Sequence, residues 1–191
     1  MKDIKKKAIL IVTDCQNDFC TGALGTKEAQ ASVPAIVRKI RECAGNGMSI
    51  IATMDTHAED YMETNEGKNL PVPHCVKDTK GWKIVPQILD ALAYANPMYL
   101  PKDRFGSPEL PGLIRTVAMD GAKGGLGAGE NLSVTIIGWC TDICVISNAL
   151  IVKSAFPEAE VFVDADCCAG VTPEAHEAAL TVLRSCQIKV V

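Results

Sequence analysis

The sequence is poor in aromatic side chains and in histidine, and it carries no excess of positive charge. Aromatic residues make up 5% of its 191 residues, three residues are histidines, and 19 basic residues are outnumbered by 23 acidic ones, which gives a formal net charge of −4. A protein without a broad cationic surface has little with which to bind a phosphate backbone. Nucleic acid is therefore not expected as a partner.

Long apolar runs are also missing. No stretch approaches the roughly 20 apolar residues that a membrane-spanning helix needs, and the first residues do not form an apolar segment followed by a small-residue cleavage site. We therefore expect no membrane partner and a cytoplasmic location. With 48% hydrophobic residues, the chain suits one globular domain over residues 1–191 that buries roughly 70% of its unfolded surface.

Cysteine, by contrast, is abundant. The nine cysteines are scattered along the chain without a C-x-x-C pair, so neither a thioredoxin-like site nor a zinc knuckle is indicated. Their odd number and the missing secretory signal favour reduced thiols. The adjacent pair Cys167 and Cys168 is interpreted as part of a turn that follows a strand.

Short apolar segments rich in β-branched residues alternate with helical patterns. Strands are expected at residues 8–13, 49–54, 98–100, 134–138, 161–163 and 188–191. Helical spacing is present at 33–44, at 86–94 and after the cap Thr172. Strands that are apolar on both faces and alternate with helices predict an α/β fold, a three-layer α/β/α sandwich around a mostly parallel, Rossmann-like sheet of about six strands. The glycine-rich segment 121–131 is interpreted as a surface loop, and whether it forms a lid is left open.

Side chains of complementary chemistry follow the first four predicted strands. They are Asp14, then Asp55 with His57, then Lys102, and then Cys144 at the start of a helix. In an open parallel sheet, ligands bind beyond the carboxyl ends of the strands, so we expect these side chains to meet. The carboxylate of Asp14 can take the thiol proton, and the ammonium of Lys102 can stabilise the thiolate, as can the positive end of a helix. The set predicts acyl transfer through a thioester on Cys144.

Each of these residues also has an ordinary structural interpretation. Asp14 and Asp55 could form turns, Lys102 could be a solvated surface residue, and Cys144 could be an inert apolar residue of a buried helix. A non-catalytic binding or redox-sensing protein is the alternative from a different functional class. The convergence of all four groups at one edge of the sheet favours an enzyme.

Three segments resemble the isochorismatase-like cysteine hydrolases, a family that includes the nicotinamidases. They are TDCQNDF at 13–19, PKDRFGS at 101–107 and GWCTDICV at 138–145, and they occur in the family's order over nearly the whole chain. The resemblance implies that Asp14 is the base, Lys102 the catalytic lysine and Cys144 the nucleophile. It also implies a cis peptide bond before Cys140, with the backbone N–H groups of Cys140 and Cys144 as oxyanion donors.

A second group of residues indicates a metal site. Asp55 and His57 are two apart, which directs both side chains the same way from an extended strand end, and Glu66 and His74 follow in the next loop. Imidazoles and carboxylates are ligands of divalent transition metals, with zinc as the first expectation and manganese or iron as alternatives. The group is similar to the metal-binding region of nicotinamidases, where the metal coordinates the pyridine nitrogen.

The resemblance also implies a substrate. Phe19, Leu24 and Phe105 match positions that line the ring pocket in the family. The implied substrate is a small-molecule amide, nicotinamide, which is hydrolysed to nicotinate and ammonia. A carbamoyl or ureido amidohydrolase and an isochorismatase acting on an enol ether are the alternatives on the same scaffold. The family also implies a homo-oligomer. His176 and Glu177 are expected to face solvent.

Overall fold

The computed structural model describes residues 6–119 and 127–191. Its centre is a six-stranded sheet in the order β3-β2-β1-β4-β5-β6, and every ladder in it is parallel. The predicted sandwich is confirmed, and the sheet is parallel throughout rather than mostly parallel. The strands are β1 (Lys7–Thr13), β2 (Ser49–Asp55), β3 (Met98–Lys102), β4 (Leu132–Trp139), β5 (Glu160–Ala169) and β6 (Lys189–Val190).

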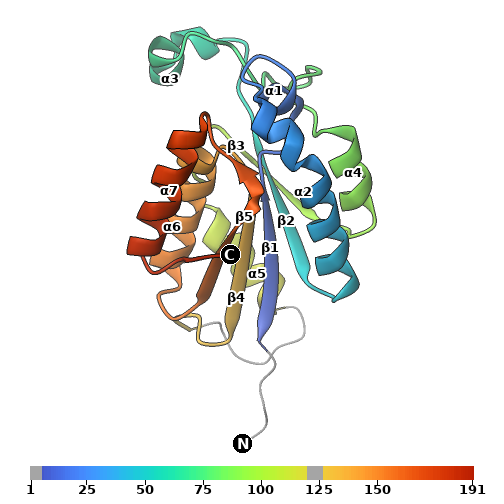
Figure 1. Ribbon diagram of the computed structural model, residues 1–191, viewed down its shortest axis with the longest axis vertical. Helices are drawn as coiled ribbons and strands as arrows, with labels where there is room; N and C mark the ends of the chain where they lie inside the picture. The colour runs from blue at the N-terminus through green and yellow to red at the C-terminus, as the bar shows by residue number, and fades with distance from the viewer. Residues whose placement is uncertain (1–5, 120–126) are drawn as a thin grey trace, which may run out of the picture.

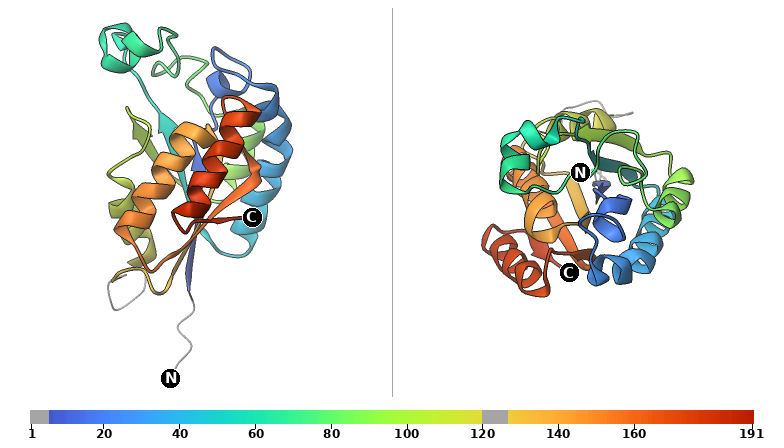
Figure 2. Two further views of the ribbon diagram at one scale, coloured as in Figure 1. Left: turned by 60° about the vertical axis from the view of Figure 1, so that its left-hand side comes forward. Right: turned by 90° about the horizontal axis from the view of Figure 1, so that it is seen from above.

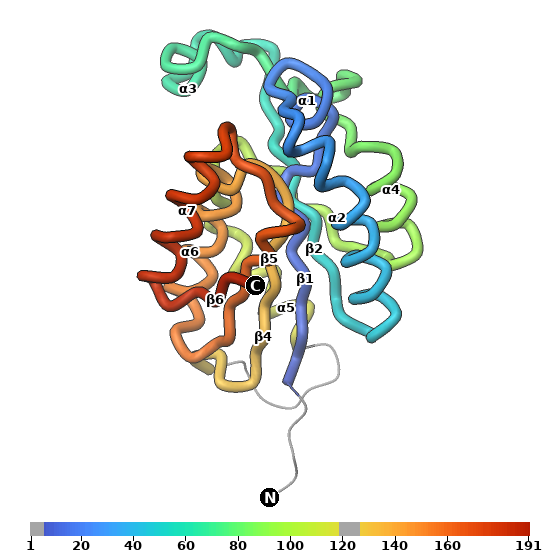
Figure 3. Tube along the Cα trace, in the orientation of Figure 1, coloured from blue at the N-terminus to red at the C-terminus, as the bar shows by residue number. Residues whose placement is uncertain are grey.

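Helices cover both faces of the sheet (Figures 1 and 2). One face is covered by α2 (Lys27–Gly45) and α4 (Pro86–Ala93), and the other by α5 (Leu110–Met119), α6 (Ile146–Ala155) and α7 (Pro173–Ser185). Two short helices, α1 (Asn17–Cys20) and α3 (Asn65–Asn69), lie beyond the carboxyl ends of the strands, as the tube in Figure 3 shows.

The alternation of side chains along the central strand divides the interior into two cores. Leu10 and Val12 of β1 pack with α2 and α4, whereas Ile9 and Ile11 pack with the helices of the other face, and all four are buried. Burial of an aliphatic side chain contributes about 1.5–3 kcal/mol. Both faces of β1 are apolar, which suits its place in the middle of the sheet, between β2 and β4. Asp14 follows at its carboxyl end.

Most predicted element bounds agree with the structure to within about two residues, with two larger differences. Helix α2 begins at Lys27, where Thr26 accepts a hydrogen bond from the Ala29 N–H, and it continues through Pro34. Strand β5 continues to Ala169, so the interpretation of Cys167 and Cys168 as turn residues is wrong. The polar Asp164 interrupts the apolar run, but its carboxylate is paired with Lys39 at 2.7 Å and remains within the strand.

Part of the predicted surface loop at 121–131 lies outside the described residues. Gly127 and Gly129 within it adopt positive φ values, and its last residues lead into β4. Within the described ranges, no helix combines the length and the apolar character that a bilayer crossing requires.

Candidate active site

Cys144 lies in a wide turn between β4 and α6. The peptide bond between Trp139 and Cys140 is cis, as the resemblance implies, and Thr141–Val145 form a single π-helical turn before α6 begins. Cys144, the expected nucleophile, therefore precedes the α-helix rather than occupying its first residue. Cys144 is buried, and its side chain reaches the cavity at the carboxyl edge of the sheet.

The approach of β4 to β1 just before this turn requires glycine. Gly138 has a φ of 116°, and a Cβ atom there would lie 2.1 Å from the carbonyl oxygen of Thr13. Only glycine adopts such a conformation readily and leaves room for so close a neighbour. The contact brings the turn that carries Cys144 beside Asp14, the residue after Thr13.

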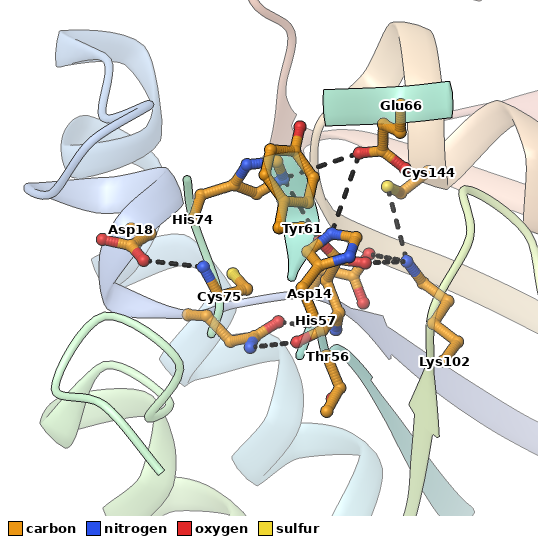
Figure 4. A network of polar contacts seen from close by, with 12 residues as sticks. Asp14, Asp18, Thr56, His57, Tyr61, Glu66, His74, Cys75, Lys102 and Cys144 are labelled. Atoms are coloured by element: carbon orange, nitrogen blue, oxygen red, sulfur yellow. Dashed lines mark hydrogen bonds and ion pairs between the residues drawn. The ribbon is translucent and has the colours of Figure 1, made fainter. Parts of the chain in front are cut away.

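Lys102 lies between Asp14 and Cys144 (Figure 4). Its Nζ atom is 2.6 Å from Oδ2 of Asp14 and 3.6 Å from Sγ of Cys144, and all three side chains are buried. Oδ1 of Asp14 accepts a hydrogen bond of 2.7 Å from Thr53. Apart from this contact with Lys102, Oδ2 has no polar partner among the described residues. The structure thus brings together the three residues expected to be catalytic.

Burial dominates the ionisation of this group. It raises the pKa of Cys144 well above that of a free thiol, the Asp14 carboxylate raises that pKa further, and Lys102 opposes both effects. Burial also raises the pKa of Asp14, again against the attraction of Lys102. Cys144 is therefore a thiol in this state, rather than the expected thiolate, and it lies beside the carboxyl group of Asp14, the expected base.

Two histidines and an aspartate meet beside this trio. Oδ2 of Asp55 lies 3.0 Å from Nε2 of His57 and 3.4 Å from Nε2 of His74, and the ligand atoms of these three residues all lie within 4.8 Å of one another. Although burial alone would raise the pKa of Asp55, hydrogen bonds from both imidazoles hold that pKa well below its usual range. Two imidazole nitrogens and one buried carboxylate are a donor set that suits a divalent transition metal such as zinc.

Glu66 lies next to the same two imidazoles. Its Oε1 atom lies 3.7 Å from Nε2 of His57 and 3.7 Å from Nε2 of His74, and its side chain is 20% exposed. Helix α3 places it there, because Thr64 caps that helix by accepting a hydrogen bond from the Gly67 N–H. All four predicted metal ligands are therefore adjacent, with Glu66 slightly further out than the other three.

Hydrogen bonds and ring contacts hold the two imidazoles. Nδ1 of His74 lies 2.8 Å from the carbonyl oxygen of Val72, which leaves Nε2 directed at the carboxylates. The ring of Tyr61 meets His57 and His74 edge-on, with centroid distances of 4.7 and 5.1 Å, and its hydroxyl donates to the carbonyl of Leu70. Support of this kind fixes ring orientation around metal centres.

A cavity of about 420 Å³ connects the two groups. It is lined both by Cys140 and Cys144 and by Asp55, Glu66 and His74. The three residues expected to surround an aromatic ring, Phe19, Leu24 and Phe105, also line this cavity. We call Asp55, His57, His74 and Glu66 the metal-type group. The thiol of Cys144 and this group therefore face one space that is large enough for a small heteroaromatic molecule.

The last helix contributes a contact that the sequence does not reveal. Nδ1 of His176 lies 2.8 Å from Oγ1 of the buried Thr141, so this half-buried side chain is turned toward the site, contrary to expectation, whereas Glu177 is exposed as expected. Asp142 accepts a hydrogen bond of 2.9 Å from the Val171 N–H. Both contacts attach the π-helical turn to the segment that begins α7. The amphipathic pattern of α7 shows which face is apolar, but not which polar side chain reaches a neighbouring turn.

Comparison with solved structures gives the same fold. A pyrazinamidase of Pyrococcus horikoshii in complex with zinc is 28% identical and superimposes with a TM-score of 0.73. The match covers 97% of this chain and 98% of the pyrazinamidase. An isochorismatase family protein from Desulfovibrio vulgaris is 22% identical over 98% of this chain and 94% of its own, with a TM-score of 0.78. The yeast nicotinamidase bound to the inhibitor nicotinaldehyde is 19% identical over 96% and 99%, with a TM-score of 0.76.

Two comparisons of the sequence itself give different results. A search of curated protein sequences gives no match. The model of the isochorismatase domain, however, matches residues 8–191, which include every element of the sheet from Ala8 onward and all residues of the candidate site. This protein belongs to the isochorismatase family of hydrolases.

Proposed function

We propose that the protein is a metal-dependent cysteine amidase that hydrolyses nicotinamide to nicotinate and ammonia. The observation that carries the proposal is the single cavity lined by Cys144, by Asp55 and His74 of the metal-type group, and by apolar side chains. The similarity to a pyrazinamidase that was solved with zinc supports the same substrate class, an amide on a nitrogen heterocycle.

Acylation begins with proton transfer inside the catalytic trio. Oδ2 of Asp14 accepts the thiol proton of Cys144 as sulfur attacks the amide carbon, and Lys102 stabilises the thiolate from 3.6 Å. The backbone N–H groups of Cys140 and Cys144 hold the oxyanion. When the tetrahedral intermediate collapses, the C–N bond breaks, and ammonia leaves with the proton from Asp14. A nicotinoyl thioester remains on Cys144.

Hydrolysis of the thioester uses the same carboxylate again. Asp14 removes a proton from a water molecule, whose oxygen attacks the thioester carbon. The C–S bond then breaks, the proton held by Asp14 returns to sulfur, and the nicotinic acid that is released loses its proton to solvent as nicotinate. Lys102 remains positively charged throughout, because burial, which would lower its pKa, is outweighed by the neighbouring carboxylates of Asp14 and Asp55, which raise it.

The metal has a binding role in this scheme. Asp55, His57 and His74, with Glu66 at the open side, would hold the ion. When bound, it supplies a Lewis-acidic position for the lone pair of the ring nitrogen. Phe19, Leu24 and Phe105 enclose the ring, and an apolar slot of this kind suits a flat heteroaromatic substrate.

The direct test is ammonia release from nicotinamide by the purified protein before chelation, after chelation and after zinc is restored. We expect release that chelation removes and zinc restores. A protein loaded with zinc, manganese or iron that releases no ammonia from nicotinamide would overturn the proposal and direct the search to carbamoyl compounds and enol ethers. The expected homo-oligomer remains a prediction, and light scattering of the purified protein would test it.

A further inference from the structure

Gln16 is completely buried, and its side chain bonds to the backbone of a metal-type ligand. Its Nε2 atom donates to the carbonyl oxygen of Asp55 at 2.7 Å, and its Oε1 atom accepts from the Asp55 N–H at 2.7 Å. The second Nε2 proton reaches the carbonyl oxygen of Trp82 at 2.8 Å. Gln16 thus binds both backbone groups of Asp55, as an adjacent strand would, at the point where β2 ends.

Asp18, two residues further on, bonds to the segment that carries the second histidine. Its Oδ2 atom accepts a hydrogen bond of 2.8 Å from the N–H of Cys75, the residue after His74 (Figure 4). Cys75 has a φ of 46°, a conformation that non-glycine residues adopt only when neighbouring contacts hold them in it. A hydrogen bond from this N–H to a carboxylate is a contact of that kind.

The carboxylate of Asp18 is itself confined. A Cβ atom at Gly81 would lie 2.0 Å from Oδ2 of Asp18, and one at Gly22 would lie 2.3 Å from Oδ1. Phe19, the next residue, packs edge-on against His74 with a centroid distance of 5.6 Å. The short segment that begins at Asp14 therefore contacts the metal-type group at Asp55 through Gln16 and at His74 through Asp18 and Phe19.

We propose that Gln16 and Asp18 are positioning residues of the metal centre. They fix the backbone on which Asp55 and His74 are carried, and they connect this backbone to the segment that holds the base Asp14 and the ring-pocket residue Phe19. The inference rests on the proposed metal site. It extends that site beyond its four ligands, because partners outside the ligand set commonly determine metal affinity by factors of about 10 to 100.

The test is the dissociation constant for zinc, measured by competition with a chromogenic chelator on stripped protein. Gln16→Met retains the length of the side chain and removes all three hydrogen bonds, and Asp18→Ala removes the acceptor for the Cys75 N–H. We expect each to weaken zinc binding by about 10- to 100-fold. Asp18→Asn retains an acceptor oxygen and should recover most of the affinity. Gly81→Ala should weaken binding without removing any polar group, because it displaces the Asp18 carboxylate.

The matched control is Asn17→Ala. Asn17 lies between the two positioning residues, but its side chain donates to the carbonyl of Lys80, which is not next to a ligand. Its zinc affinity should stay within about twofold of wild type. All constants are measured below the melting transition of each variant, recorded by circular dichroism, so that a loss of stability does not count as a loss of affinity. If Gln16→Met does not fold, the comparison of Asp18→Ala with Asp18→Asn decides.

The outcomes separate this inference from the proposed function. Folded variants that bind zinc as tightly as wild type would overturn the positioning role and leave the amidase proposal intact. Weakened variants of a zinc-binding protein that releases no ammonia from nicotinamide would support the positioning role and overturn the substrate. A wild-type protein that binds no zinc would overturn both the metal centre and this inference.

Discussion

The ammonium of Lys102 lies 2.6 Å from the carboxylate of Asp14, and their side chains are 1% and 0% exposed. Removing two opposite charges from water is costly, and the attraction between them offsets that cost only while both are present. The burial of the Asp14 carboxylate therefore depends on Lys102, whose ammonium also lies 3.3 Å from Oδ1 of Asp55.

Lys102→Met should destabilise the protein strongly. It leaves the charges of Asp14 and Asp55 without their shared cation, and the loss of one partner from a buried ion pair typically costs about 3–5 kcal/mol. Urea denaturation at neutral pH measures this loss. Adding Asp14→Asn to the Lys102→Met protein should recover part of the lost free energy of unfolding, and a Lys102→Met protein as stable as wild type would contradict the buried pair.

The pH profile of kcat/KM should report the ionisation of Asp14. Burial raises the pKa of this base, so activity should fall on acidification at a pH above about 3.9, the ordinary value for aspartate. Although burial would lower the pKa of Lys102, the carboxylates of Asp14 and Asp55 raise it, so its deprotonation should not limit activity up to about pH 10. Lys102→Met removes the effect that lowers the pKa of Asp14, and the acid limb of its residual activity should move to higher pH. A limb that moved to lower pH would exclude Asp14 as the base.

Cys144→Ala should abolish turnover and leave the fold intact. The change removes a single sulfur atom from a buried position, whereas loss of a catalytic nucleophile lowers kcat by about 10³-fold or more. Ammonia release and thermal melting are measured on the same preparation. Cys186→Ala, at the end of α7, is the matched control and should retain full activity. Normal turnover by Cys144→Ala would exclude the thioester.

The four metal-type ligands should not contribute equally. His74→Ala removes a buried nitrogen 3.4 Å from Asp55 and should reduce bound zinc to well below one ion per chain, with a parallel loss of activity. Glu66→Gln changes a partly exposed group 3.7 Å from either imidazole, and it should lower zinc affinity by a smaller factor. Elemental analysis and chelator competition give both values. Equal losses in the two variants would indicate that Glu66 is as close a ligand as His74.

The ring pocket can be tested at Phe105, which is 49% exposed and lines the catalytic cavity. Phe105→Ala should raise KM for nicotinamide by about 10-fold, because it removes roughly 1–2 kcal/mol of apolar contact from bound substrate, with a smaller change in kcat. Tyr94→Ala, at an 83% exposed position at the end of α4, serves as the control. A KM that is unchanged in Phe105→Ala would place the substrate elsewhere in the cavity.

The parallel arrangement of the strands and the edge at which the polar residues meet could be predicted from the sequence, because buried parallel strands are apolar on both faces. The ends of β1 and β2 could be located for this reason, and Asp14 and Asp55 with them. The full length of β5 could not be predicted, because Asp164 interrupts its apolar run. The charge of this carboxylate is neutralised by Lys39 of α2, a pairing that the sequence does not reveal.

The supporting contacts of the site were less accessible than its reacting groups. Gln16, Asp18 and His176 each bond to a residue at least 35 positions away. A hydrogen bond between a side chain and a distant backbone or hydroxyl group leaves no periodic pattern in the sequence. A nucleophile, a base and a set of metal ligands, by contrast, have recognisable chemistry of their own.

The two oxygens of Asp55 face different halves of the site. Oδ1 lies 3.3 Å from the ammonium of Lys102, and Oδ2 lies 3.0 Å from the imidazole of His57. A divalent cation at Oδ2 would draw on the same negative charge that Lys102 shares, leaving that ammonium more dependent on Asp14. A substitution that changes the charge in one half of the site would therefore change the electrostatic balance in the other half. Binding or loss of an ion at the proposed metal site would therefore change the charge balance around Lys102 as well.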